Sequence, residues 1–117
     1  MELTVIMVNY KCDKHKLNSC LKSIDVQTKV LIIDHSNDLK KDQIIIPKNI
    51  FLKILKNENL GNGAGINYGI KHAETKYVLY LDIDTILPKN FFSDLKKNVS
   101  QINDFAIIAP KINDFYN

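Results

Sequence analysis

Short apolar runs recur along this chain and predict a set of buried β-strands. Each run is rich in Val, Ile, Leu or Phe and is continuously apolar rather than alternating. Continuous hydrophobicity is typical of strands that are covered on both faces in a mainly parallel sheet. The runs that we interpret as strands are residues 3–8, 30–33, 50–55, 77–81 and 105–109.

Between these runs, apolar residues recur at helical spacing. The first such segment follows Asp13, a residue type that caps helix amino termini. Another follows the glycine-rich segment 59–69, and a third follows Pro88, because proline suits the first turn of a helix. The polar segment 35–49 predicts only a short helix or turn. The apolar positions are Leu17, Leu21 and Ile24 in the first helix, Ala64, Tyr68 and either Ile70 or Ala73 in the second, and Phe91, Phe92, Leu95, Val99 and Ile102 in the third.

This alternation of strands and helices predicts an α/β fold, in which a doubly wound, mainly parallel sheet is flanked by helices. A chain of 117 residues is long enough for one such domain, and no linker or internal repeat divides it. We therefore expect residues 1–117 to form a single domain.

Charge and composition narrow the range of partners and compartments. The formal net charge is +3, and all 16 basic residues are lysines. The absence of arginine disfavours nucleic-acid recognition, which relies on the bidentate guanidinium group. No apolar run approaches the roughly 20 residues of a membrane span, and the amino terminus lacks the features of a signal peptide. We therefore expect a cytoplasmic protein with free thiols at Cys12 and Cys20, and the lysines leave open a peripheral attraction to the inner membrane surface.

The most informative feature is a pair of aspartates, Asp82 and Asp84, directly after the apolar run 77–81. Ligand sites of open α/β sheets lie beyond the carboxyl ends of the strands. Two carboxylates at such a position form a hard oxygen site that suits Mg²⁺ or Mn²⁺, and the ion could hold a phosphorylated ligand. The simpler alternative is a solvated turn, in which aspartate is common.

The glycine-rich segment 59–69 matches neither of the common phosphate-binding loops. A dinucleotide-binding G-x-G-x-x-G pattern fails because Ile66 stands where the third glycine would fall, and no Gly-Lys-Ser/Thr follows as in a P-loop. What remains is a lead into a helix whose free amides could face an anion or a sugar. The alternative is that the glycines serve only the close packing of a helix on the sheet.

Polar residues also follow the first two predicted strands. Asp34 could accept a hydrogen bond from a ribose hydroxyl or a base, or it could cap the turn that follows it. Tyr10, which follows Asn9, could stack on a base or belong to the core. His15 and His72 stand alone on predicted helices, and we assign them no role.

An ordered set of motifs covers nearly the whole chain. The motifs are Val8-Asn9-Tyr10, Leu17-Asn-Ser-Cys-Leu-Lys-Ser-Ile24, Ile33-Asp-His-Ser-Asn-Asp38, Asn57-Glu-Asn-Leu-Gly-Asn-Gly-Ala-Gly-Ile-Asn-Tyr-Gly-Ile70, Tyr77-Val-Leu-Tyr-Leu-Asp-Ile-Asp84, Leu87-Pro88 and Ile108-Ala-Pro-Lys-Ile112. In this order and spacing they resemble the donor half of family 2 glycosyltransferases with the GT-A fold, and the match is best to the rhamnosyltransferase-like branch. The chain departs from that family at His35-Ser36, where many relatives have an acidic residue followed by Gly-Ser.

The resemblance implies an activity and a role for each matching residue. Family members transfer a glycosyl group from a nucleotide-diphospho-sugar to an acceptor hydroxyl, on a glycan or a lipid-linked acceptor, in the synthesis of cell-surface polysaccharides or other glycans. A divalent cation, Mn²⁺ or Mg²⁺, bridges the diphosphate and stabilises the departing nucleoside diphosphate. The implied positions are Asn9 and Tyr10 in the base pocket, Asp34 at the nucleoside, Asn59, Gly61 and Asn67 beside the donor, Asp82 near the ribose and sugar, and Asp84 as the direct metal ligand with Asp82 as the second carboxylate.

The resemblance leaves the catalytic residue unassigned. In inverting members the acceptor-binding half supplies a carboxylate base, and no residue of this chain matches it. The chain could therefore be a truncated, inactive donor-binding half whose partner is a missing acceptor half. We also expect self-association, most simply as a two-fold homodimer, through the apolar residues Phe105, Ile107, Ile108, Phe115 and Tyr116.

A remote alternative is a phosphatase of the haloacid-dehalogenase-like class. Asp82, Asp84 and Thr85 fit its D-x-D-x-T motif, in which the first aspartate is a nucleophile and the second a general acid. That motif usually opens the domain, however, and too few residues follow it here to supply the remaining catalytic groups.

Overall fold

The computed structural model describes residues 2–102, in which four parallel strands form one sheet. The first four apolar runs of the sequence form these strands, with boundaries that differ by one or two residues from the predicted ones. The predicted strand at 105–109 and the apolar residues on which the expected dimer rests lie outside the described residues. The strands are β1 (Leu3–Asn9), β2 (Thr28–Asp34), β3 (Ile50–Lys56) and β4 (Tyr77–Tyr80), in the spatial order β3-β2-β1-β4.

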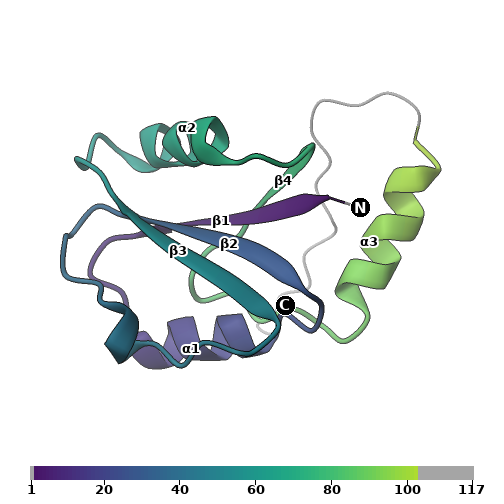
Figure 1. Cartoon of the computed structure of the whole chain (residues 1–117), viewed down its shortest axis with the longest axis horizontal. Helices are drawn as coiled ribbons and strands as arrows, with labels where there is room; N and C mark the ends of the chain where they lie inside the picture. Colours follow the sequence, from purple (N-terminus) through teal and green to yellow (C-terminus); the bar gives the residue numbers. More distant parts are fainter. Residues whose placement is uncertain (1, 103–117) are drawn as a thin grey trace, which may run out of the picture.

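Helices flank this sheet, as the sequence predicts. They are α1 (Lys14–Lys22), α2 (Asn62–His72), α3 (Phe91–Ser100) and a short 3₁₀ helix, η1 (Lys41–Gln43), in the polar segment between β2 and β3. Figure 1 shows α1 and α2 on opposite faces of the sheet and α3 beside the strands. The expected doubly wound α/β architecture is therefore confirmed. No helix within residues 2–102 is long and apolar enough to cross a membrane.

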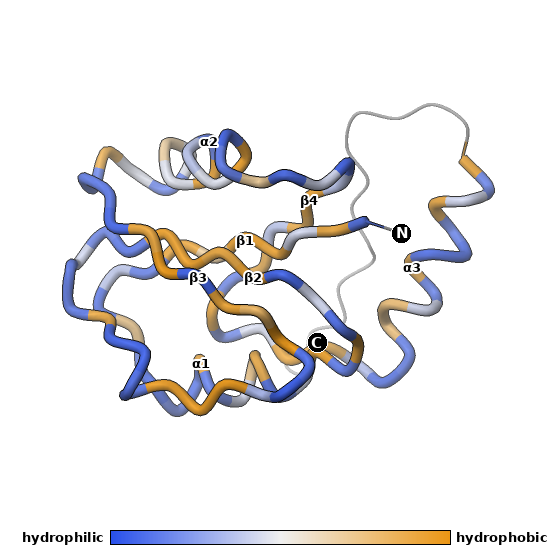
Figure 2. The backbone as a smooth tube through the Cα atoms, in the orientation of Figure 1, coloured by the Kyte–Doolittle hydropathy of each residue, from blue (hydrophilic) through white to orange (hydrophobic). Residues whose placement is uncertain are grey.

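The face covered by α1 holds the larger part of the apolar core. Asp13 caps α1, as predicted, because its side chain accepts a hydrogen bond from the His15 amide at 2.9 Å. Alternate strand residues point toward this helix, since side chains alternate between the two faces along a strand. Figure 2 shows the apolar residues concentrated along the central strands. The core residues here are Val5 and Met7 of β1, Val30 and Ile32 of β2, and Leu17, Cys20 and Leu21 of α1.

The opposite face meets α2 through glycines rather than through large apolar side chains. The buried residues of α2 are Gly65 and Gly69. A Cβ atom on Gly65 would lie 2.7 Å from His35 Cε1 and 2.9 Å from Val8 Cγ2. A Cβ atom on Gly69 would lie 2.7 Å from Ile6 Cγ2. The close-packing role that we considered for these glycines is therefore observed.

The third helix begins later than the sequence predicts. Asn90 adopts the left-handed conformation, with φ 68°, immediately before α3 starts at Phe91. Asparagine tolerates this conformation better than most residues. The Pro88 carbonyl accepts a hydrogen bond from the Phe91 amide at 3.2 Å, so this proline belongs to the preceding turn and not to the helix. Of the predicted apolar side, Phe92 is buried, whereas Ile102 lies beyond the helix end and is exposed.

We expect Gly69→Ala to lower the free energy of unfolding by about 1–3 kcal/mol. The new Cβ must displace Ile6, whose buried, branched side chain lies 2.7 Å away. Gly63→Ala is the matched control, because no heavy atom lies within 4 Å of its Cβ position and alanine is favoured over glycine inside a helix. Urea unfolding of the two variants and the wild type measures the difference, and wild-type stability of Gly69→Ala would contradict the close approach.

Candidate functional site

Polar residues from separate segments meet at one edge of the sheet. Because the strands are parallel, Asn9 and Asp34 are register partners at the carboxyl ends of β1 and β2. Asp82 follows β4 at the same edge, and the glycine-rich segment 59–69 enters α2 there after leaving β3. These segments therefore converge on one edge of the sheet.

Asn9 and Asp34 form the buried floor of this edge. Neither side chain has any exposed surface. Asn9 Nδ2 donates a hydrogen bond to Asp34 Oδ1 at 2.8 Å, and Asn9 Oδ1 accepts one from the Cys12 amide at 3.1 Å. Asn9 therefore connects the two central strands and also holds the start of the loop that follows β1.

Asp34 also closes the turn after β2. Its Oδ1 accepts hydrogen bonds from the amides of Ser36 and Asn37 at 3.2 Å each. Its Oδ2 accepts one from the Leu39 amide at 3.1 Å. The capping role that we considered for Asp34 is therefore observed. A contact with a nucleoside stays a prediction, for which Oδ2 has one further lone pair.

A charged and aromatic rim extends from this floor to the surface. Ser36 Oγ donates a hydrogen bond to Asp38 Oδ1 at 2.5 Å, and Lys14 Nζ lies 3.8 Å from Asp38 Oδ2. The Ser36 hydrogen bond, and to a smaller extent the charge of Lys14, lower the pKa of Asp38 below its usual value. Tyr10 stands at this rim with 57% of its surface exposed, so the core alternative for this residue is wrong. The Lys11 ammonium lies 5.4 Å from the centre of the Tyr10 ring.

The glycine-rich segment leads into the open start of α2. Asn59 Oδ1 accepts a hydrogen bond from the Gly61 amide at 3.1 Å, and Gly61 has a φ of 101°, which favours glycine. The first backbone hydrogen bond at this end runs from the Gly65 amide to the Gly61 carbonyl at 3.2 Å. The amides of residues 62–64 therefore lack partners within the helix, which suits an anionic or hydroxyl-rich ligand. Asn67 is exposed and makes no side-chain hydrogen bond within residues 2–102.

The two aspartates after β4 differ in their surroundings, although both are exposed. The Thr85 amide donates to the Asp82 carbonyl at 2.9 Å, which forms a tight turn. Asp82 Oδ1 accepts a hydrogen bond from the Tyr80 hydroxyl at 2.7 Å, and Asn62 Nδ2 donates to the same hydroxyl oxygen at 3.1 Å. Burial raises the pKa of Tyr80, so this hydroxyl keeps its proton at neutral pH. Asp84 makes no hydrogen bond or ion pair within the part of the chain that the structure describes.

The aspartate turn also touches α1. Cys20 Sγ lies 3.9 Å from the Asp82 carbonyl oxygen. Burial, followed by the charge of Asp84, raises the pKa of the Cys20 thiol to about 11. This thiol is therefore protonated and unreactive at neutral pH. Burial also raises the pKa of Cys12, and the prediction that both cysteines are free is confirmed.

The donor set at this edge fits a divalent cation that is shared with a ligand. No cluster of three or more His, Cys, Asp or Glu residues suited to a metal occurs within residues 2–102. The site therefore offers the two carboxylates of Asp82 and Asp84, whereas Mg²⁺ prefers six oxygen ligands. Diphosphate oxygens and water would complete such a shell, which is the usual arrangement for Mg²⁺ beside a phosphorylated ligand.

His35 is the residue at this edge that the sequence reasoning missed. It follows Asp34, is only 9% exposed, and lies beneath Gly65 of α2. Its Nε2 atom has no hydrogen-bond partner among the described residues. The only signal in the sequence was the departure from the family pattern at this position. His15 and His72, to which we assigned no role, are both exposed.

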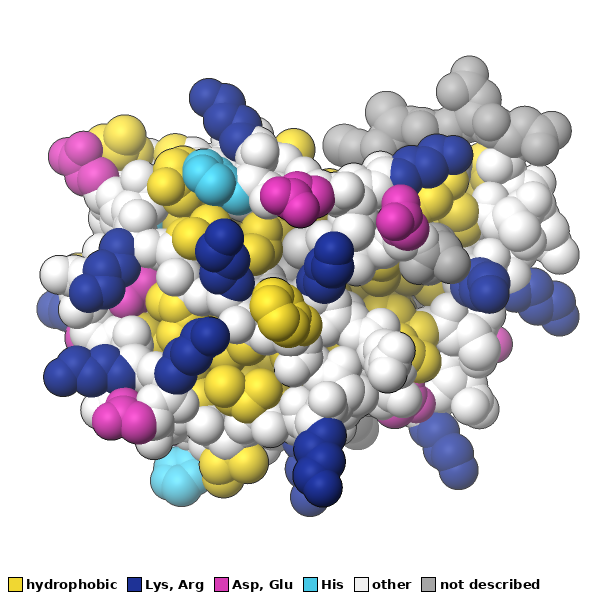
Figure 3. All heavy atoms as spheres, in the orientation of Figure 1, with side chains coloured by type: hydrophobic (Ala, Val, Ile, Leu, Met, Phe, Trp, Pro, Cys, Tyr) yellow, Lys and Arg dark blue, Asp and Glu magenta, His cyan; other side chains and the backbone are white. Residues whose placement is uncertain are grey.

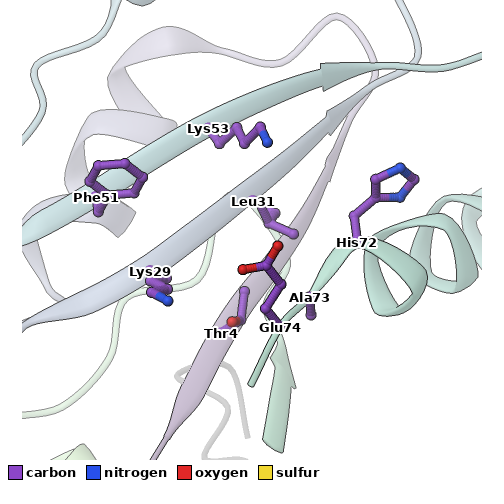
Figure 4. Close-up of a pocket in the computed structure, with 8 residues that line it drawn as sticks. All are labelled: Thr4, Lys29, Leu31, Phe51, Lys53, His72, Ala73 and Glu74. Carbon is purple, nitrogen blue, oxygen red and sulfur yellow. The ribbon is translucent and has the colours of Figure 1, made fainter. Parts of the chain in front are cut away.

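A hollow of about 130 Å³ lies away from this edge, near the amino ends of the strands (Figure 4). It contains none of the residues predicted to bind the donor, so the candidate site is an open surface and not this hollow. On the face seen in Figure 3, lysine side chains are spread among apolar patches and do not gather into one stripe. The residues that line the hollow are Thr4, Lys29, Leu31, Phe51, Lys53, His72, Ala73 and Glu74.

Comparisons with known proteins agree with this geometry. The family model described as glycosyl transferase family 2 matches residues 4–115. An uncharacterised glycosyltransferase of Methanocaldococcus jannaschii, MJ1057, is 33% identical in an alignment of 104 residues, and the match covers 80% of this chain and 36% of that protein. The crystal structure of residues 1–349 of S. aureus TarS matches with a TM-score of 0.65 and 21% identity, over 86% of this chain and 33% of that chain.

These matches define the fold and the family. The TarS match supports the GT-A-like α/β fold, and this chain spans about a third of the length of each of the two proteins. The phosphatase alternative finds no support in these matches. Because the family model covers nearly all of the sequence, the chain belongs to glycosyl transferase family 2.

Proposed function

We propose that this chain binds a nucleotide-diphospho-sugar together with Mn²⁺ or Mg²⁺ and serves the transfer of the glycosyl group to an acceptor hydroxyl. One observation carries the proposal: an exposed aspartate pair, an exposed tyrosine and the open start of a helix share one edge of the sheet. The acceptor is a glycan or a lipid-linked molecule in the synthesis of cell-surface polysaccharides or other glycans. The sequence motifs favour the rhamnosyltransferase-like branch of the family.

The base and ribose of the donor fit beside the end of β1. Tyr10 offers an exposed ring, and stacking of a base on an aromatic ring contributes about 1–3 kcal/mol. Asn9 holds the Asp34 carboxylate in place, and because that carboxylate is completely buried, its Oδ2 can accept from a ribose hydroxyl or a base imino group only when the turn after β2 shifts. We therefore assign stacking to Tyr10, nucleoside contact to Asp34 and support of that contact to Asn9.

The diphosphate and sugar fit between the aspartate pair and α2. Asp84 has no partner within residues 2–102 and is our direct metal ligand, whereas Asp82 faces the ribose and sugar as the second carboxylate. A bound divalent cation supplies Lewis-acid stabilisation of the negative charge on the departing nucleoside diphosphate. The amides at the start of α2, with Asn59, Gly61 and Asn67 nearby, border the anionic and hydroxyl groups of the donor.

The alternative is that this chain is a donor-binding half, which binds the nucleotide-sugar but does not transfer the glycosyl group by itself. This chain spans 36% of the length of the M. jannaschii relative and 33% of the TarS chain. We have assigned no residue as the base that deprotonates the acceptor. In this alternative the base comes from an acceptor-binding half or from a second copy of the chain. A transfer assay with added acceptor distinguishes the two, since the alternative predicts donor binding without glycosyl transfer.

Calorimetric titration tests the proposal directly. A panel of nucleoside diphosphates and their sugar conjugates is titrated into the chain with Mn²⁺ and again with a chelator. We expect binding of at least one member in the presence of Mn²⁺ and a large loss of affinity with the chelator. Equal affinity in both conditions would contradict the metal assignment, and no binding by any member would contradict the proposal as a whole.

We expect Asp84→Asn to lower the Mn²⁺-dependent affinity for the nucleoside diphosphate by about tenfold or more, which corresponds to about 1.4 kcal/mol. The substitution removes one negative charge from the cation site at nearly constant volume. The fold should survive, because Asp84 is exposed and makes no hydrogen bond within the described residues. Asp25→Asn removes an exposed carboxylate outside the site and serves as the matched control. Affinity of Asp84→Asn equal to that of the control would show that Asp84 is not a metal ligand.

We expect Tyr10→Ala to weaken nucleotide binding by about 1–3 kcal/mol through loss of base stacking. Its melting temperature should stay near that of the wild type, because the ring is 57% exposed. Phe51→Ala removes a ring that is 72% exposed on β3, away from the site, and should leave nucleotide affinity unchanged. Calorimetry measures the affinity, and wild-type binding by Tyr10→Ala would remove Tyr10 from the base pocket.

A further inference from the structure

A chain of hydrogen bonds joins the first turn of α2 to the aspartate pair. Asn62, the first residue of α2, donates through Nδ2 to the Tyr80 hydroxyl oxygen at 3.1 Å. The Tyr80 hydroxyl in turn donates to Asp82 Oδ1 at 2.7 Å. A single hydroxyl group therefore connects the glycine-rich segment with the aspartate turn.

This connection matters because the glycines at the start of α2 do not contact the sheet as closely as the later glycines do. The Cβ positions of Gly61 and Gly63 have no heavy atom within 4 Å, whereas those of Gly65 and Gly69 are in close contact with side chains beneath them. Glycine also leaves the backbone more freedom than any other residue. The closest approach of these glycines to the sheet is thus at Gly65 and Gly69, and Asn62 links the first turn of the helix to β4.

Tyr80 is well placed to hold both ends of the connection. It is the last residue of β4 and pairs with Ile6 of β1, which is completely buried. The strand therefore fixes the position from which the Tyr80 side chain extends. Its hydroxyl accepts one hydrogen bond and donates another, whereas a phenylalanine at this position would do neither.

We propose that Tyr80 is a positioning residue that couples order in the glycine-rich segment to the orientation of the Asp82 carboxylate. This coupling rests on the proposed function, because the binding of the donor and its metal ion is the event that uses Asp82. A ligand that fixes Asp82 also strengthens the attachment of Asn62 through the shared hydroxyl. By thermodynamic reciprocity, an ordered first turn of α2 raises the affinity for that ligand.

The two aspartates thereby take different parts in binding. Asp82 is oriented before the ligand arrives, because its carboxylate already accepts the Tyr80 hydrogen bond. Asp84 makes no such bond within residues 2–102, so its carboxylate can turn toward a cation. Loss of the Tyr80 hydroxyl is therefore expected to reduce affinity without removing a metal ligand.

Backbone amide exchange of the ligand-free chain tests whether the Tyr80 hydroxyl orders the glycine-rich segment. We expect exchange of the Gly61 and Gly65 amides, which donate to Asn59 Oδ1 and to the Gly61 carbonyl, to be about fivefold faster in Tyr80→Phe and in Asn62→Ala than in the wild type. Tyr68→Phe is the matched control, because it removes a hydroxyl that has no hydrogen-bond partner among the described residues from the same helix. Unchanged exchange in Tyr80→Phe overturns the proposal.

Calorimetric titration with UDP, GDP and dTDP, each with Mn²⁺, tests whether the Tyr80 hydroxyl contributes to nucleotide binding. We expect the affinity of the binding nucleotide to fall about fivefold in each single variant and no further in the Tyr80→Phe, Asn62→Ala double variant, because both substitutions break one chain of bonds. Additive losses, or wild-type affinity in Tyr80→Phe, overturn the coupling. If the wild type binds no nucleotide while Tyr80→Phe still speeds exchange of the Gly61 and Gly65 amides, the proposed function fails and the structural role of Tyr80 is supported.

Discussion

The hydrogen bond between Asn9 and Asp34 is the interaction on which the rest of this edge depends. A carboxylate that is completely buried without partners would cost several kcal/mol, and Asn9 supplies one of the donors that prevent this cost. The same pair holds the segments that leave the sheet. Asn9 Oδ1 accepts from the Cys12 amide after β1, and the Asp34 carbonyl accepts from the Asn57 amide after β3. The loops that border the candidate site therefore start from one rigid point.

From this point the site extends between two layers that are built differently. The α1 layer meets the sheet through large apolar side chains, and Cys20 of that layer touches the aspartate turn. The α2 layer meets the sheet through glycines, and its first residue reaches the same turn through Tyr80. Asp82 thus contacts Cys20 through its carbonyl and Tyr80 through its carboxylate, which holds the aspartate turn in a defined position relative to the sheet.

The sequence predicted the strands and helices because continuous apolar runs and helical spacing are direct consequences of burial. It could not predict that Asp34 uses most of its hydrogen-bonding capacity within its own turn, since capping and ligand binding need the same residue type at the same place. The hydrogen bond between Asn62 and Tyr80 could not be predicted from the sequence either. Asparagine and tyrosine occur in many structural environments, and only the fold brings these two residues together. The start of α3 was misplaced because proline fits both a first helical turn and the turn before it, and Asn90 takes the left-handed conformation that separates the two.

The glycines on the buried face of α2 also set the depth of the site. A helix that rests on glycine approaches a sheet more closely than one that rests on larger side chains, and Gly65 and Gly69 permit this approach over β1 and His35. The open amides at the start of α2 therefore lie at the same edge as the strand ends, where the polar residues converge. The distance between the helix terminus and the floor of the site is decided by two buried residues that have no side chains.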